Sequence, residues 1–245
     1  MTDPEVLADA TDTVELGTLV LCNQFRHPAI LAKMAVTLDE VCAGRFILGI
    51  GAGWNKPEFQ AFGLPFDHRV GRLEEALQII TPLLRTGRVD FTGRYYQARD
   101  CELAPRGPRA GGPPLLVAGS GPRMLRLTAQ YADMWNPSEY VSAPHALGGH
   151  RAKLRAACQE AGRSPSAVEL TAHVPLTFPD LGTPPASSNI PAHLSGSTEE
   201  VAGAMLALDE MGASHLMFYC APYNTGALER LADSARICRR ESVRA

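Results

Sequence analysis

The stretch Pro114–Asn136, PLLVAGSGPRMLRLTAQYADMWN, decides the fold class that the sequence predicts. It opens on the apolar run Leu115–Ala118, which is short enough for a buried strand. Three small residues follow, and Pro122 then stands at an expected first helical position, because its ring fixes φ and its missing N–H is not needed there. Apolar residues at helical spacing come next. The stretch therefore predicts a strand, a glycine turn and a helix.

The turn Gly119-Ser120-Gly121-Pro122 is typical of an anion-binding site. Backbone N–H groups at the start of a helix have no partner within the helix, and they lie at the positive end of its dipole. Phosphate is the usual ligand of such a turn. The alternative is an ordinary tight connection between a strand and a helix that binds nothing.

Five other segments read as strands followed by helices, at residues 14–22, 45–51, 132–136, 167–175 and 215–220. Their nearly continuous apolar character predicts a parallel sheet covered by helices. Repeated units of this kind form either an open doubly wound sheet or a closed barrel. The irregular spacing of six short strands does not choose between the two.

Several local features carry more specific predictions. A helix is expected to begin at Pro28, with His27 as its starting residue rather than a catalyst. The residues of that helix expected to face the core are Ile30, Leu31, Met34, Leu38 and Val41. Pro57–Pro65 is expected to be a loop, and Val89–Tyr96 a hairpin turning at Thr92-Gly93.

Towards the C-terminus, Ser197 with Glu200 predicts a capping box for a helix that begins at Thr198. The segment before it, residues 176–196, is rich in Pro, Ser and Gly and is expected to be a mobile loop of one domain that spans residues 1–245.

Gly49, Gly51 and Gly53 spell G-x-G-x-G at the end of the strand at 45–51 and suggest a dinucleotide-binding fold. We reject this reading, because the third glycine comes one place early and Trp54–Pro57 does not lead straight into a helix. The glycines still predict a backbone that another group approaches closely.

The composition excludes several classes of protein. With 245 residues, 45% hydrophobic residues and a net charge of −3, the chain is a globular protein without the basic surface that nucleic acid or anionic membranes attract. Its six cysteines are widely spaced, which argues against a zinc site and a disulfide framework and favours the cytoplasm. The N-terminus lacks the features of a signal peptide, and no apolar run approaches the roughly 20 residues of a membrane span.

Three ordered motifs carry a family resemblance: LGTLVL, RHPAILAKMAVTLDEVCAGRFILGIGAGWNKPEFQAFG and the stretch quoted first. Together they resemble the bacterial-luciferase-like flavin and deazaflavin oxidoreductases, and most closely the class that uses coenzyme F420. The resemblance implies a TIM-type (β/α)8 barrel with its cofactor at the C-terminal ends of the strands. It also implies that the barrel is incomplete here, with about six parallel strands, because the family's first strand, first helix and second strand have no counterpart.

The resemblance assigns cofactor-binding roles to three segments. Gly119, Ser120, Gly121 and Pro122 match the family's phosphate turn, and Gly51, Ala52, Gly53 and Trp54 match the strand end beside the ring of the cofactor. Leu19 and Val20 match a bulge behind that ring, where several members carry a non-prolyl cis peptide. One departure is Met124, which stands where many relatives have a threonine hydroxyl for the phosphate.

His173, late in a predicted strand, is the candidate general acid or base. Three functions remain open from the sequence. The first is hydride transfer between F420 and a small organic substrate. The second is a monooxygenase that uses reduced FMN and oxygen, and the third is a non-catalytic relative that keeps only the phosphate turn. No metal is expected, and a homo-oligomer is compatible with the sequence.

Overall fold

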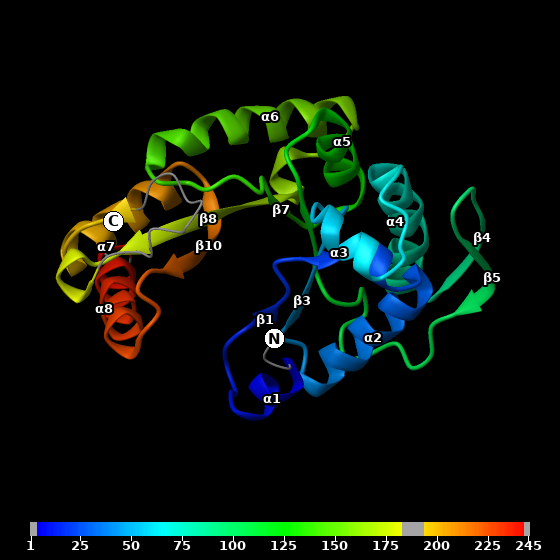
Figure 1. The fold of residues 1–245 in the computed structure, drawn as a ribbon, viewed down its shortest axis with the longest axis horizontal. Helices are drawn as coiled ribbons and strands as arrows, with labels where there is room; N and C mark the ends of the chain where they lie inside the picture. Colours follow the sequence, from blue (N-terminus) through cyan, green and yellow to red (C-terminus); the bar gives the residue numbers. More distant parts are fainter. Residues whose placement is uncertain (1–3, 183–193, 243–245) are drawn as a thin grey trace. The chain divides into compact units, whose positions relative to one another are not determined.

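The computed structural model describes residues 4–182 and 194–242. The chain divides into two compact units, Met1–Trp135 and Asn136–Ala245. Both belong to the α/β class, with helices packed on parallel strands (Figure 1). Each unit is described below by itself.

Unit 1 is built around β3, an entirely buried strand of six residues. The strands β1, β2 and β6 all pair with β3 in parallel, and β7 follows β6 in the strand order. The bounds are β1 Leu16–Gly17, β2 Leu21–Cys22, β3 Phe46–Gly51, β6 Leu115–Ala118 and β7 Met134–Asn136.

The helices of unit 1 pack in the order α2, α4 and α5 and enclose its core with the strands (Figure 1). The hairpin of β4 and β5 lies against α4. A hairpin is found where one was predicted, but its turn spans residues 93–96 and its second strand begins at Gln97, beyond the predicted range Val89–Tyr96. The bounds are α1 Pro4–Asp9, α2 Pro28–Val41, α3 Lys56–Ala61, α4 Arg69–Thr86, β4 Arg88–Thr92, β5 Gln97–Glu102 and α5 Pro122–Tyr131.

Helix α2 begins as predicted but turns a different face to the core. The His27 Nδ1 atom accepts a hydrogen bond of 3.2 Å from the Ala29 N–H, so this histidine is the N-cap. The apolar residues of α2 that the core buries are Leu31, Ala32, Ala35 and Val36. Ile30, Met34 and Val41, expected inside, are exposed. The predicted inward face was therefore wrong in three of its five residues.

Unit 2 contains the parallel strands β8 and β10, with β9 pairing beside β8. Helices α7 and α8 pack on each other. Side chains from β8, β10, α7 and α8 form a hydrophobic core, which includes Leu176, Phe178 and Val201. The bounds are α6 Leu147–Glu160, β8 Glu169–Thr177, β9 Leu194–Ser195, α7 Thr198–Glu210, β10 Ala213–Cys220 and α8 Thr225–Ser242. The capping box of Ser197 and Glu200 at the start of α7 is confirmed.

Two loop predictions need correction. Pro57–Pro65 is not wholly a loop, because Pro57 occupies the first turn of the short helix α3, where a missing N–H costs nothing. The expectation that Trp54–Pro57 leads into no helix was therefore wrong as well. In the predicted loop at 176–196, β8 continues to Thr177, and residues 183–193 lie outside the described residues.

The number of strands agrees with the predicted incomplete barrel. If β1 and β2 count as one interrupted strand, the described residues hold six principal strands, namely β1/β2, β3, β6, β7, β8 and β10. In the described part of the sheet, β1 has β3 as its neighbour and β10 has β8. The strands β1 and β10 are therefore edge strands of their own units.

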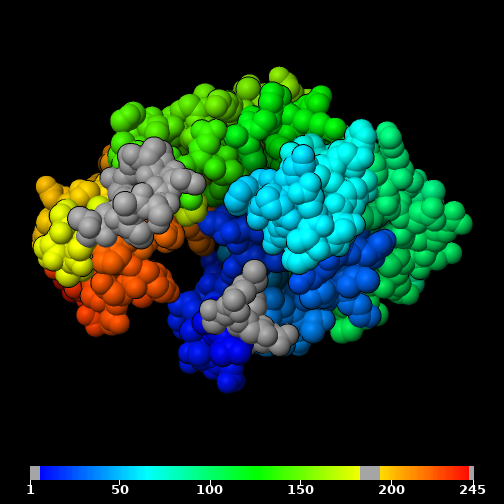
Figure 2. Space-filling view, viewed as in Figure 1, coloured from blue at the N-terminus to red at the C-terminus, as the bar shows by residue number. Residues whose placement is uncertain are grey.

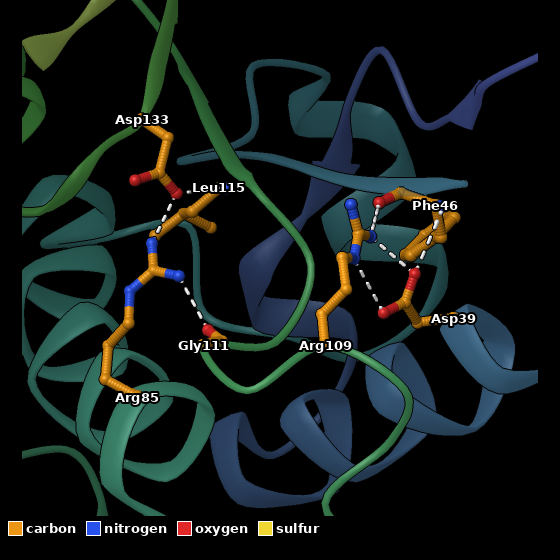
Figure 3. Close-up of polar contacts among 7 residues, drawn as sticks. All are labelled: Asp39, Phe46, Arg85, Arg109, Gly111, Leu115 and Asp133. Atoms are coloured by element: carbon orange, nitrogen blue, oxygen red, sulfur yellow. Dashed lines mark hydrogen bonds and ion pairs between the residues drawn. The ribbon is translucent and has the colours of Figure 1, made fainter. Parts of the chain in front are cut away.

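Two arginine–aspartate pairs anchor connections in unit 1 (Figure 3). Arg109 binds Asp39 at the end of α2 and the Phe46 carbonyl at the start of β3. Arg85 binds Asp133 and donates a hydrogen bond of 2.6 Å to the Gly111 carbonyl. Sequence patterns predicted neither pair, because Asp39 and Arg109 lie 70 residues apart in the chain and Arg85 and Asp133 lie 48 residues apart.

Candidate cofactor site at the strand ends of unit 1

The structure brings together the three segments that the family resemblance singled out. In the parallel pairing of β3 with β6, Gly51 lies opposite Ala118. The segments Gly51–Trp54 and Gly119–Pro122 therefore leave neighbouring strands at the same, C-terminal edge. Val20 is also close, because a Cβ atom on Gly51 would lie 3.0 Å from its side chain. Their roles in cofactor binding remain a prediction.

The strand β1/β2 is interrupted by a bulge. Gly17 pairs with Ile47 and Leu21 with Ile50, so three residues of β1/β2 stand opposite two residues of β3. The Thr18 hydroxyl bridges the gap, since it donates to the Gly49 carbonyl at 2.8 Å and accepts from the Gly49 N–H at 3.0 Å. Within the bulge the Leu19–Val20 peptide bond is cis. The predicted irregular backbone is confirmed.

The three glycines of G-x-G-x-G are explained by close packing within the chain. A Cβ atom on Gly49 would lie 1.8 Å from the Thr18 carbonyl oxygen. At Gly53, which has a φ of +81°, it would lie 2.6 Å from the Cys22 Sγ atom. The predicted close approach is confirmed, and the approaching groups at these glycines belong to the chain itself.

The turn after β6 has the predicted geometry. Pro122 opens α5 and Gly121 is its N-cap, with an extended backbone. The first hydrogen bond of the helix runs from the Leu125 N–H to the Gly121 carbonyl at 2.9 Å. The N–H groups of Arg123 and Met124 lie before that bond, so they have no backbone partner among the described residues. A Cβ atom on Gly121 would meet nothing within 4 Å, which leaves room for a ligand.

The start of α5 suits an anion, although the Arg123 side chain is already paired with a carboxylate. The first turn of α5 holds no acidic residue. The Arg123 guanidinium forms an ion pair with Glu74 of α4, and both line a cavity of about 530 Å³ between α4 and the tip of the β4–β5 hairpin. Met124 is buried against Gly119 and offers no hydroxyl. The residues present therefore fit a phosphate held by backbone N–H groups, helped by the helix dipole.

The two tryptophans play different roles. Trp135 is fully buried, and its indole N–H donates a hydrogen bond of 2.8 Å to the Gly119 carbonyl, so it fixes the turn from the core side. Trp54 follows β3 and is 85% exposed. An exposed indole of this size beside the strand ends is available to a planar ligand.

Sequence reasoning missed two amide side chains that are buried at the same edge of unit 1. Asn23 and Gln24 directly follow β2, and the Gln24 side-chain nitrogen points at the Ala52 carbonyl. Burial raises the pKa of the Tyr96 hydroxyl, and neither polar atom of the buried Asn23 side chain has a hydrogen-bond partner among the described residues. The signal in the sequence was the polar pair that directly follows an apolar strand.

His173 belongs to unit 2, in the middle of β8. Its imidazole ring packs on Tyr140, with ring centroids 4.7 Å apart. Burial lowers the pKa of His173, so its neutral form is favoured. A neutral imidazole can accept a proton, as a general base must.

We expect His173 to make the protein sensitive to acid. The unfolded chain binds the proton near the ordinary pKa of about 6.5, whereas the folded chain binds it at lower pH, so stability falls as the pH drops below that value. His173→Gln should reduce this loss between pH 7 and 5. Urea unfolding followed by circular dichroism measures it, with the exposed His145→Gln as control. An unchanged loss of stability in His173→Gln would contradict the prediction.

Neither a metal site nor a membrane-spanning helix is found in the part of the chain that the structure describes. Within residues 4–182 and 194–242, no cluster of three or more His, Cys, Asp or Glu side chains is arranged to hold a metal ion. In the same part of the chain, no helix combines the length and the apolar character that crossing a membrane requires.

The fold and the strand-end site define an α/β protein of the luciferase-like class. The model of the luciferase-like monooxygenase family matches residues 6–180, so this chain belongs to that family. The predicted resemblance and fold class are thereby confirmed.

Similar proteins in sequence include pyrimidine monooxygenases named RutA. The one from Caulobacter sp. strain K31 is 36% identical over 167 residues, which cover 64% of this chain and 45% of the relative. The one from Stutzerimonas stutzeri strain A1501 is also 36% identical, with 44% of its length covered. The chain thus spans less than half the length of these curated relatives.

Similar solved structures share the fold at low sequence identity. The coenzyme F420-dependent tetrahydromethanopterin reductase from Methanopyrus kandleri has a TM-score of 0.79 and 18% identity, over 97% of this chain and 86% of that one. A riboflavin lyase, RcaE, solved with modified FMN and riboflavin, has a TM-score of 0.80 and 16% identity, over 98% and 74%.

Proposed function

We propose that this chain binds reduced FMN at the strand ends of unit 1 and serves in the monooxygenation of a small organic molecule. The carrying observation is the turn Gly119–Pro122, whose N–H groups at the start of α5 are available to a phosphate. The family and the relatives at 36% identity, all named monooxygenases, support this reaction class over the others.

The residues of unit 1 would divide the work of holding the cofactor. The N–H groups of Arg123 and Met124 would bind its phosphate, and Trp135 would keep the turn in place through the Gly119 carbonyl. Leu19, Val20 and the segment Gly51–Trp54 would lie along its ring. When bound, reduced flavin supplies the electrons that activate oxygen. We propose His173 as the side chain that exchanges a proton with the substrate.

Hydride transfer with F420 is the second candidate. In F420 the phosphate is esterified on both sides, so a chain must continue past it. Gly121 and Pro122 are exposed, and a Cβ atom on Gly121 would meet nothing within 4 Å, which leaves the outer side of the turn open for such a chain. The two cofactors absorb and fluoresce differently, so titration of the purified protein with each separates the candidates. Incorporation of labelled oxygen into a product then tests for monooxygenation.

Gly121→Asp is expected to weaken binding of FMN or F420 at least about tenfold, because it places a carboxylate beside the phosphate at the mouth of the site. The substitution should leave the fold intact, since the backbone of Gly121 (φ −69°, ψ 155°) suits any residue and Asp is a favoured N-cap. Fluorescence titration measures the affinity.

Gly121→Asn is the matched control, because it has the same shape and capping ability without the charge. It should bind clearly more tightly than Gly121→Asp. Equal affinity of the two variants and the wild type would show that the turn does not hold the phosphate.

A further inference from the structure

A carboxylate of α4 lies beside the turn Gly119–Pro122. Arg123 is the second residue of α5, and its guanidinium forms an ion pair with the Glu74 side chain. Both side chains are partly exposed and line the cavity between α4 and the tip of the β4–β5 hairpin. Figure 2 shows the hairpin (green) at the surface of unit 1, beside the segment that leads into α4 (cyan). The arginine that follows the turn is therefore directed towards α4, where a carboxylate neutralises its charge.

Glu75, the next residue of α4, is already bound to the hairpin. Its carboxylate accepts hydrogen bonds of 2.7, 2.8 and 3.0 Å from three successive backbone N–H groups, those of Arg94, Tyr95 and Tyr96. A carboxylate with these partners has little capacity left for a guanidinium. Among the described residues that line the cavity, the negative charge that balances Arg123 is therefore that of Glu74.

The backbone of α4 helps to place the ion pair. A Cβ atom on Gly71 would lie 3.4 Å from a guanidinium nitrogen of Arg123 and 3.6 Å from the Tyr95 hydroxyl oxygen. Glycine at this position therefore gives the Arg123 side chain room to lie against α4. Glu74 follows three residues later, on the same side of the helix. The position of the pair is thus determined by close packing as well as by charge.

We propose that Glu74 is a specificity-determining residue of the phosphate site, because its pairing with Arg123 withholds a positive charge from the turn. The inference rests on the proposed function, in which the turn binds the phosphate of the cofactor. That phosphate then meets backbone N–H groups and the helix dipole, without a net charge from the side-chain pair. Glu74 therefore lets the turn accept a singly charged phosphate diester as well as a doubly charged monoester.

The charge of the ligand decides the size of the expected effect. Coulomb energy is proportional to charge, so an unpaired arginine adds twice as much binding free energy for a dianion as for a monoanion. The factor by which the affinity rises for the dianion is then the square of the factor for the monoanion. A ligand without a phosphate should not respond.

Three ligands with the same flavin ring test the proposal at about pH 8. Riboflavin has no phosphate, riboflavin 4′,5′-cyclic phosphate carries one negative charge on its diester, and FMN carries two on its monoester. Glu74→Gln should bind FMN about tenfold and the cyclic phosphate about threefold more tightly than the wild type does, with riboflavin unchanged. Fluorescence titration measures the three affinities, and added salt should reduce both increases.

Variants of Arg123 separate the charge of the pair from a direct bond to the phosphate. Arg123→Gln leaves Glu74 unpaired and should weaken FMN binding about tenfold. The double variant Glu74→Gln with Arg123→Gln has no charge at this place, so its affinity for FMN should equal that of the wild type. Glu102→Gln is the matched control, because it also removes an acid from an ion pair with an arginine, at the base of the hairpin instead of its tip, and FMN binding should not change. Circular dichroism confirms that each variant is folded.

The results that overturn the proposal are distinct from those that overturn the proposed function. Equal binding of riboflavin and FMN to the wild type would show that the turn holds no phosphate, so both would fail. FMN that binds more tightly than riboflavin, but equally to the wild type and to Glu74→Gln, would overturn only the role of Glu74. An equal increase for all three ligands would place the effect of Glu74 at the ring. A double variant about tenfold weaker than the wild type would show that Arg123 binds the phosphate directly despite Glu74.

Discussion

Asp39→Ala should lower the free energy of unfolding of unit 1 by about 3–5 kcal/mol, since it leaves both the largely buried Arg109 guanidinium and the buried Phe46 N–H without their carboxylate partner. The side chain of Asp39 is only 1% exposed, and that of Arg109 is 27% exposed. Typical domains are stable by only about 5–15 kcal/mol, so a loss of this size removes much of the margin.

The geometry explains why Asp39 matters more than an ordinary charge. Its Oδ2 atom accepts from Nε of Arg109 at 2.9 Å, and its Oδ1 atom accepts from the Phe46 N–H at 3.2 Å (Figure 3). The second guanidinium nitrogen that binds Asp39 also donates to the Phe46 carbonyl. One carboxylate therefore ties the end of α2, the connector before β6 and the first residue of β3 together.

Urea unfolding followed by tryptophan fluorescence measures this loss specifically, because both tryptophans, Trp54 and Trp135, lie in unit 1. The control is Glu102→Ala, which removes the partner of Arg88 in an ion pair of 3.0 Å between exposed side chains. That change should cost at most about 1 kcal/mol. Equal effects of the two substitutions would show that burial does not strengthen the Asp39 pair.

The sequence predicted best the features that short-range chemistry determines. The turn Gly119–Pro122 and the capping box of Ser197 with Glu200 depend on residues next to each other, and both are found as expected. The bulge at Leu19–Val20 was predicted from the family resemblance alone. Local sequence could not reveal it, because it arises from the register of β1 and β2 against β3, about 30 residues later in the chain.

Long-range packing explains what the sequence could not show. Helix α2 has two apolar stripes, and periodicity cannot tell which of them a core will bury, so Ile30 and Met34 were placed inside. The role of Asp39 could not be predicted from the sequence, because its partner Arg109 is 70 residues away. The hydrogen bond from Trp135 to the Gly119 carbonyl could be seen only in the fold.

The candidate site depends on this packing as much as on its own residues. The glycines at the end of β3 suggested a ligand to sequence reasoning, yet the structure shows that they accommodate Thr18, Val20 and Cys22. They can therefore serve a cofactor indirectly, by letting the bulge of β1/β2 lie tightly against the strand end. Substitutions at these glycines should disturb the site even where they touch no ligand.

Gly49→Ala is expected to destabilise unit 1 by at least about 3 kcal/mol, through overpacking and the loss of two hydrogen bonds. The added Cβ atom would lie 1.8 Å from the Thr18 carbonyl oxygen, a backbone atom that cannot move without its strand. To relieve the clash, the bulge must leave β3, which breaks both bonds between the Thr18 hydroxyl and Gly49. Tryptophan fluorescence in urea measures the loss. Gly203→Ala in helix α7 of unit 2 is the control, followed by circular dichroism because both tryptophans lie in unit 1. A Cβ atom there meets nothing within 4 Å and alanine favours the helix, so stability should stay equal or rise by about 0.5–1 kcal/mol. In the milder variant Thr18→Val, only the hydroxyl bonds are lost, and the cost should be about 1–2 kcal/mol. If Gly49→Ala proved no more damaging than Thr18→Val, the close contact of the bulge with β3 would be wrong.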